Sequence, residues 1–161
     1  MNFTAGTTGQ VLTANSSTPA TFQNLIMQSA SVTLSSAQVK ALTTTPITVV
    51  PAAGAGTVLL IVNYISKLIY GGTNAFTGGG NLDLRYNNSS GQKANYGEVA
   101  AGINSTSNQT SSSISINFSD IVYSSLENLP LVVCNTSTAW GGNAANNNQV
   151  VLLVYYFTIK I

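Results

Sequence analysis

The chain has 161 residues, enough for one compact domain with a core of its own. Charged residues make up only 6% of it, against roughly 25% in a typical soluble domain, and asparagine, serine and threonine take their place. The five lysine and arginine residues are scattered singly, whereas phosphate binding needs clusters, and no apolar run is long enough for a transmembrane helix. Neither nucleic acid nor a membrane is therefore an expected partner.

The net charge of +1 favours close association. Amides and hydroxyls hydrate a surface without long-range repulsion, so copies of the chain can approach one another closely. The composition indicates an ordered array or a tight oligomer rather than a merely neutral globular domain. The N-terminal residues lack the basic and apolar segments of a signal peptide, and the single Cys134 rules out an intramolecular disulfide. Synthesis in a reducing cytoplasm is the expectation.

Residues 1–24 are predicted to form an extended N-terminal arm, and residues 25–161 a single β-rich domain. In the arm, turn-forming residues alternate with short β-prone pieces, and Val11, Leu12 and Phe22 are isolated apolar anchors. An uncharged arm of this kind is suited to pairing with a sheet edge on another subunit. A terminus that is disordered or packs on its own domain is the alternative.

Loose alternation over residues 25–34 predicts a first strand, and residues 35–42 predict a short helix with Ser35 or Ser36 as its N-cap. A short strand follows at Ile47–Val50. Residues 81–86 alternate cleanly, which predicts a strand with Leu82, Leu84 and Tyr86 toward the core and Asp83 and Arg85 toward solvent.

Further along the chain, strands are predicted at residues 98–103, 113–118 and 131–134, and Asp120 is predicted to cap a short helix that runs to Glu127. About seven to nine strands, long turn-rich connections and one or two short helices predict an all-β fold. The expected architecture is an antiparallel β-sandwich or a jelly-roll-like domain.

Two long segments, Val58–Tyr70 and Val150–Ile161, are apolar on both faces. A strand of an isolated sandwich shows one face to the core and the other to water. An uncovered apolar face is unfavourable by roughly 1.5–3 kcal/mol per side chain, so we expect sister chains to cover it, with a self-covered monomer as the alternative. The predicted oligomer interface consists of Leu59, Ile61, Ile65, Ile69, Val150, Leu152, Val154 and Tyr156.

The sequence offers little for catalysis, because it has no histidine to serve as a general base or metal ligand. Cys134 lies in an apolar strand and is expected to be a packed small side chain rather than a nucleophile. The carboxylates Asp83, Glu98, Asp120 and Glu127 would have to supply any glycosidase-type pair. No catalytic, cofactor-binding or metal-binding residue is predicted, and the chain is not expected to be an enzyme.

Several segments resemble bacteriophage virion proteins. The arm, with a GQVLT piece at residues 9–13 and a PATFQ piece at 19–23, is similar to a linker of tail-fibre and other virion proteins. Residues 42–56, residues 78–86 and the closing strand with Tyr155 and Tyr156 look like parts of a β-rich domain in phage structural proteins. Together these segments span about half of the chain.

The resemblance to capsid decoration (cement) proteins and head fibres implies a homotrimer on the outer capsid surface that stabilises the shell. Its partners would be other copies of itself and the major capsid protein, its location the virion, and its site of synthesis the host cytoplasm. The anchors Val11, Leu12 and Phe22 would then contact the capsid or a neighbouring subunit. The resemblance to tail fibres implies instead a tip module that binds host surface glycans through Asn-rich loops and Trp140, although core packing is the simpler explanation of Trp140.

Overall fold

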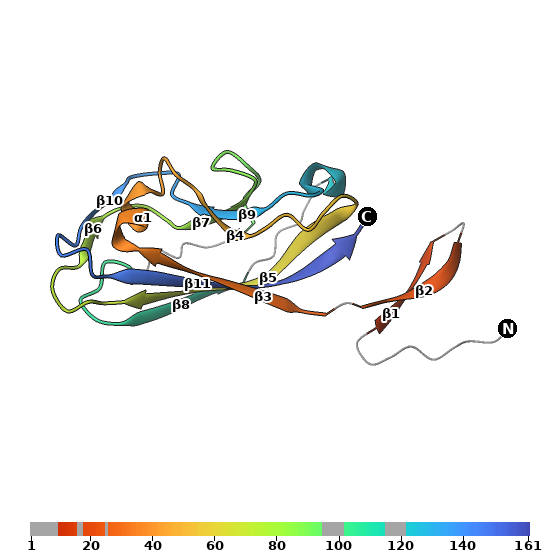
Figure 1. The fold of residues 1–161 in the computed structure, drawn as a ribbon, viewed down its shortest axis with the longest axis horizontal. Coiled ribbons are helices and arrows are strands. Elements are labelled where there is room, and N and C mark those ends of the chain that lie inside the picture. The colour runs from red at the N-terminus through yellow and green to blue at the C-terminus, as the bar shows by residue number, and fades with distance from the viewer. Residues whose placement is uncertain (1–9, 16–17, 25, 95–101, 115–121) are drawn as a thin grey trace.

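A computed structural model describes residues 10–15, 18–24, 26–94, 102–114 and 122–161 (Figure 1). A four-stranded antiparallel sheet forms one layer, in the order β3 (Gln28–Ser35), β11 (Gln149–Lys160), β5 (Thr57–Ile69) and β8 (Gln109–Ile114). A three-stranded sheet of β4 (Ile47–Val50), β9 (Leu131–Cys134) and β7 (Asp83–Tyr86) lies over it. The predicted all-β, sandwich-like fold is confirmed.

The remaining described strands form two sheets of two strands each. β6 (Phe76–Gly78) pairs with β10 (Trp140–Gly142) at the end of the sandwich that also carries α1 (Ser36–Ala41). In the predicted arm, β1 (Gln10–Asn15) and β2 (Thr18–Asn24) pair with each other as an antiparallel hairpin, in which Leu12 lies opposite Phe22. The β-prone pieces of the arm are therefore strands of one hairpin.

The sequence predicts Ser35 or Ser36 as the N-cap of the short helix, and in the structure the N-cap is Ser35. The Ser35 hydroxyl accepts a hydrogen bond from the backbone N–H of Gln38 at 3.3 Å, and the Gln38 side chain accepts one from the backbone N–H of Ser35 at 2.8 Å. This reciprocal capping box satisfies two backbone donors of the first turn. The helix predicted after Asp120 is a single 3-10 turn, η1 (Tyr123–Leu126), and its N-cap is Val122 rather than Asp120, which is outside the described residues.

β5 and β11 form the longest ladder, and it contains one irregularity. Tyr155 pairs with Asn63 but Tyr156 pairs with Ile61, so Val62 is an extra residue in β5. Such a bulge reverses which alternate residues of the strand point to each face. Before Val62 the odd-numbered residues of β5 face the core, and after it the even-numbered ones do.

The core lies between the two layers. Its fully buried side chains come from both sheets, the helix and the loops, and the largest are Tyr64, Tyr86, Phe76, Leu34, Leu42, Leu59, Ile61, Leu82, Leu84, Ile103, Leu126 and Leu131. The inward positions predicted for Leu82, Leu84 and Tyr86 are confirmed. β8 begins earlier than the strand predicted at residues 113–118, whose last four residues are outside the described part, as are residues 98–101 of the predicted strand at 98–103.

Candidate interaction surface

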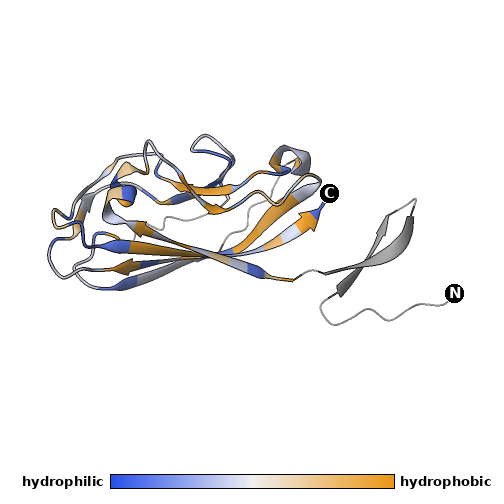
Figure 2. Cartoon of the chain, viewed as in Figure 1, coloured by the Kyte–Doolittle hydropathy of each residue, from blue (hydrophilic) through white to orange (hydrophobic). Residues whose placement is uncertain are grey.

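The side of the four-stranded sheet that faces away from the sandwich is apolar along its two central strands. No described helix or strand lies on this side (Figure 1), and Figure 2 shows apolar bands along both β5 and β11. The cross-strand partners Leu153 with Ile65 and Phe157 with Leu60 place both strands' side chains on one surface. We call this surface the outer face; its partly exposed apolar side chains are Leu60, Ile65, Ile69, Val151, Leu153, Tyr155, Phe157 and Ile159.

The structure corrects most of the predicted interface. Ile65 and Ile69 lie on the outer face, and their place in an oligomer interface stays a prediction. The other predicted interface residues lie on the opposite face: Tyr156 packs against the core, and buried within it are Leu59, Ile61, Val150, Leu152 and Val154. The apolar residues of β11 that remain available to a partner are the odd-numbered ones.

The reason for the correction differs between the two strands. In β5, the residues do not alternate between the two faces from one end of the strand to the other, because Val62 is an extra residue in the ladder. Leu59 and Ile61, before Val62, therefore face the core, whereas odd-numbered residues after it face outward. In β11, both faces are apolar, so hydrophobicity cannot tell the core face from the outer face. No signal in the sequence of either strand marks these assignments.

Hydroxyl side chains border the outer face on both sides. Along one row across the sheet, Ser31 of β3 pairs with Leu153, Leu153 with Ile65, and Ile65 with Ser112 of β8. A neighbouring row has Thr33 and Thr110 at its ends and Val151 and Lys67 at its centre. The surface is therefore an apolar strip between two uncharged polar borders, with Lys67 exposed in its second row.

An apolar cleft of about 320 Å³ continues the outer face toward the C-terminal end of β11. Tyr123 of η1 and Ile161 form its exposed rim, at 53% and 52% exposure. Its full lining is Val58, Leu60, Tyr123, Ile159, Lys160 and Ile161. Large apolar side chains exposed together in this way mark surfaces that bind other proteins.

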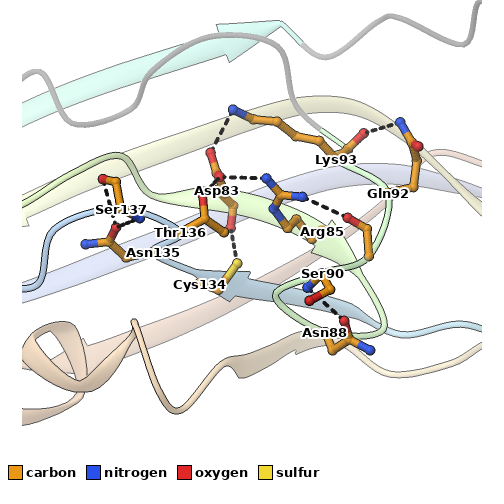
Figure 3. Close-up of polar contacts among 11 residues, drawn as sticks. Asp83, Arg85, Asn88, Ser90, Gln92, Lys93, Cys134, Asn135, Thr136 and Ser137 are labelled. Atoms are coloured by element: carbon orange, nitrogen blue, oxygen red, sulfur yellow. Dashed lines mark hydrogen bonds and ion pairs between the residues drawn. The ribbon is translucent and has the colours of Figure 1, made fainter.

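Asp83 is the centre of the main charged cluster, shown in Figure 3. Its carboxylate lies 2.7 Å from the Lys93 ammonium and 3.2 Å from the Arg85 guanidinium, and it accepts a hydrogen bond from the Thr136 hydroxyl at 2.7 Å. Asp83 is only 2% exposed, so the prediction that it faces solvent is wrong. Its two cationic partners and one hydroxyl compensate for the lost hydration.

These partners also set the pKa of Asp83. Burial raises the pKa of the carboxyl, but the hydrogen bonds from Lys93 and Thr136 and the charge of Lys93 outweigh it, so the pKa lies below its ordinary value. A carboxylate that stays ionised between two cations has no proton to donate, so it stabilises the fold and does not act as a general acid. It links β7 to the loop that carries Lys93 and to the chain after β9.

Cys134, beside Asp83, also has a role in packing rather than in chemistry. Cys134 is buried, donates weakly to the Asp83 carbonyl at 3.7 Å, and has a pKa that burial raises, as expected for a packed small side chain. The described residues hold no group of three or more His, Cys, Asp or Glu side chains that could bind a metal ion. No described helix is long and apolar enough to cross a membrane.

The Asn-rich loop before β11 is held together by its own amides. Asn143 is fully buried; its Oδ1 accepts from the Ser36 hydroxyl at 2.6 Å and from the Asn148 N–H at 3.1 Å, and its Nδ2 donates to the Asn74 carbonyl at 2.7 Å. Trp140 is 5% exposed and meets Phe76 edge to face, with ring centroids 6.3 Å apart. A glycan-binding tip would use Asn-rich loops and Trp140, but the Asn143 and Trp140 side chains are buried and make contacts within the domain.

The architecture defines the class as an antiparallel β-sandwich with an apolar outer face. No family model matches the chain, and no curated protein matches it. Among solved structures, the chain is similar to a chain of the cyanophage Pam1 capsid asymmetric unit, with a TM-score of 0.40 and 10% sequence identity. That similarity covers 98% of this chain and 91% of the other.

Proposed function

We propose that this chain is a phage capsid decoration (cement) protein, which forms a homotrimer on the outer capsid surface and stabilises the shell without catalysing a reaction. The observation that carries the proposal is the outer face, an apolar strip that the described part of the chain leaves partly exposed. A second support is the resemblance of the arm and of several strand segments to phage virion proteins.

The energetics favour a partner on the outer face. Full burial of a large apolar side chain stabilises by roughly 1.5–3 kcal/mol, and these side chains are already partly covered, so association gains on the order of 1 kcal/mol for each. Val151, Leu153, Tyr155, Phe157 and Ile159 of β11 contribute from every subunit. Burial of these side chains therefore favours association, against the loss of translational and rotational freedom that association costs.

The major capsid protein is the proposed second partner. The N-terminal residues 1–24 carry no charged residue, so their contacts would depend on backbone pairing and on the anchors Val11, Leu12 and Phe22. Contacts of this kind are insensitive to salt. An uncharged arm can therefore bind a shell whether the surrounding ionic strength is low or high.

The oligomer is tested by sedimentation velocity at micromolar concentration. The wild-type chain is expected to sediment as a trimer, and Leu153→Asn, on the outer face, is expected to sediment as a folded monomer. Thr48→Asn, at an exposed position of β4 in the other layer, is the matched control and should remain a trimer. A wild-type chain that sediments as a folded monomer would overturn the proposal.

The capsid role is tested by binding to shells that lack this protein. Wild-type protein should bind them in many copies per shell and raise the temperature at which they release their contents. The full chain with Val11→Ser, Leu12→Ser and Phe22→Ser should remain a trimer yet bind weakly. Binding to host glycans together with no binding to shells would favour the tail-fibre tip instead.

A further inference from the structure

Both edges of the three-stranded sheet are protected against pairing with another chain. β4 has Pro46 before it, Pro51 after it and an irregular register at Val49. Residues 92–94 run along the second side of β7, and two backbone hydrogen bonds of 3.0 and 2.7 Å join them to that strand. Prolines, bulges and covering segments are the usual means by which proteins avoid edge-to-edge association.

The edge of the four-stranded sheet at β3 has none of this protection. β3 is eight residues long, its register with β11 is uninterrupted, and its sequence QSASVTLS has neither a charge nor a proline. In the described part of the chain, β11 is the one strand that pairs with β3. Outside that ladder, the Ser35 N–H at the end of the strand donates to the Gln38 side chain at 2.8 Å. The backbone groups on the second side of β3 are therefore open to another strand.

This edge is complementary to itself. A two-fold axis perpendicular to the sheet reverses the direction of a strand and leaves the outer face on the same side. Two copies related by such an axis therefore place β3 beside β3 as an antiparallel pair, the arrangement that every pair in the four-stranded sheet already has. Because both copies use the same surface, the contact closes on itself after two chains.

The side chains of β3 also suit such a pair. Ser29, Ser31 and Thr33 are exposed on the side of the outer face, and hydroxyl side chains on paired strands hydrogen-bond to one another. On the opposite side, Ala30 and Val32 are half-buried against the core, so their counterparts in a second copy would extend that apolar contact. No like charges meet, because the strand carries none.

We propose that β3 of one copy pairs with β3 of a second copy about a two-fold axis, so that two four-stranded sheets become one sheet of eight strands. The contact uses the edge and leaves the outer face free, so it does not depend on the trimer. On a shell it would join one trimer to the next, a step that rests on the proposed function.

The pair, which we call the β3 seam, depends mainly on backbone hydrogen bonds and buries little apolar surface. We therefore expect it to be weak in dilute protein and to form when copies are concentrated. Holding copies side by side on a shell has the same effect, because it raises their effective concentration.

Engineered cysteines in the full chain test the β3 seam. Because the outer faces of both copies lie on one side, residues 29, 31 and 33 face one another whatever the register. Ser31→Cys and Thr33→Cys alone test registers centred on those residues, and Ser29→Cys or Thr33→Cys combined with Ser31→Cys tests the registers between. Directly opposite residues of an antiparallel pair lie within disulfide range. The native Cys134 is buried.

The matched control is Thr48→Cys, at an exposed position of the protected strand β4. After mild oxidation of concentrated protein, at least one β3 variant should form a covalent dimer and nothing larger, whereas Thr48→Cys should remain a single chain. If no β3 variant cross-links more than this control, the seam is wrong. A double variant that gives a ladder beyond two chains would show head-to-tail pairing and would also overturn it.

The same variants in a Leu153→Asn background separate the seam from the trimer. Covalent dimers that persist there would show that the seam forms without the outer face, and their complete loss would overturn it. A wild-type chain that sediments as a monomer while the β3 variants cross-link would remove the proposed trimer and leave the seam. A trimer whose β3 variants do not cross-link would leave the proposed function and remove the seam.

Discussion

Replacing Asn143 by alanine removes the amide that joins the Asn-rich loop to α1 and to the loop at Asn74. Two buried groups then lose their acceptor, the Ser36 hydroxyl and the Asn148 N–H, while the Asn74 carbonyl keeps its bond from the Asn148 amide at 2.9 Å. A buried polar group without a partner is unfavourable by about 1–3 kcal/mol. We therefore expect Asn143→Ala to lower the free energy of unfolding by about 2–6 kcal/mol.

The backbone of Asn143 adds a second effect, because its φ is +42°, a conformation that alanine adopts less readily than asparagine. Asn146→Ala is the matched control: its φ is +50°, but its side chain is exposed and accepts a bond from Lys40. Urea and thermal unfolding measure both variants, at roughly 2–4 °C per kcal/mol for a chain of this size. Equal destabilisation within about 1 kcal/mol would refute the network argument.

Three further outcomes are expected. Asp83→Asn should destabilise the protein at neutral pH. Because the pKa of the Asp83 carboxyl is lower in the folded chain than in the unfolded chain, the ionised carboxyl stabilises the fold at any pH above the unfolded pKa of about 4. This stabilisation is lost as the pH falls through the lowered pKa of the folded state. The difference from wild type in urea unfolding should therefore shrink in acid, and a constant difference would contradict the ion-pair explanation. Gly79→Ala places a Cβ 2.0 Å from the Trp140 ring at a φ of +85°, so we expect a loss of about 2 kcal/mol or more, with a wild-type-like midpoint as the contrary result. Cys134, buried with a raised pKa, should react with a thiol reagent only after unfolding, and rapid reaction in the native state would show that its strand opens.

Local patterns in the sequence were sufficient for much of the fold. The alternation of Leu82, Leu84 and Tyr86 predicts the core face of β7 because each of these residues is flanked by polar ones. The serine before residues 36–41 predicts the helix start because its hydroxyl can bond the exposed backbone donors. The three-residue strands β6 and β10 were missed, since segments so short have no periodicity to detect.

The candidate surface was predicted less well, for two physical reasons. An extended strand with apolar residues on both faces has no preferred side until its neighbours are known, so Leu152 and Leu153 could not be told apart. The alternation of residues 81–86 predicts Asp83 in solvent, but its burial depends on contacts with Lys93 and Thr136. Neither residue lies in the same strand, so the local pattern does not reveal these contacts. What the sequence did indicate is that these two long strands carry more apolar surface than one sandwich can bury.

Because Val62 is an extra residue in β5, odd-numbered residues before it and odd-numbered residues after it lie on opposite faces of the sheet. Substitutions at Leu59 and Ile61 alter the interior, whereas substitutions at Ile65 and Ile69, separated from them by an even number of positions, alter the exterior. A related chain that lacks the insertion would have to exchange the polarity of one half to keep the same architecture. Aligning such relatives by their hydrophobic pattern therefore requires a one-residue gap in mid-strand rather than in a loop.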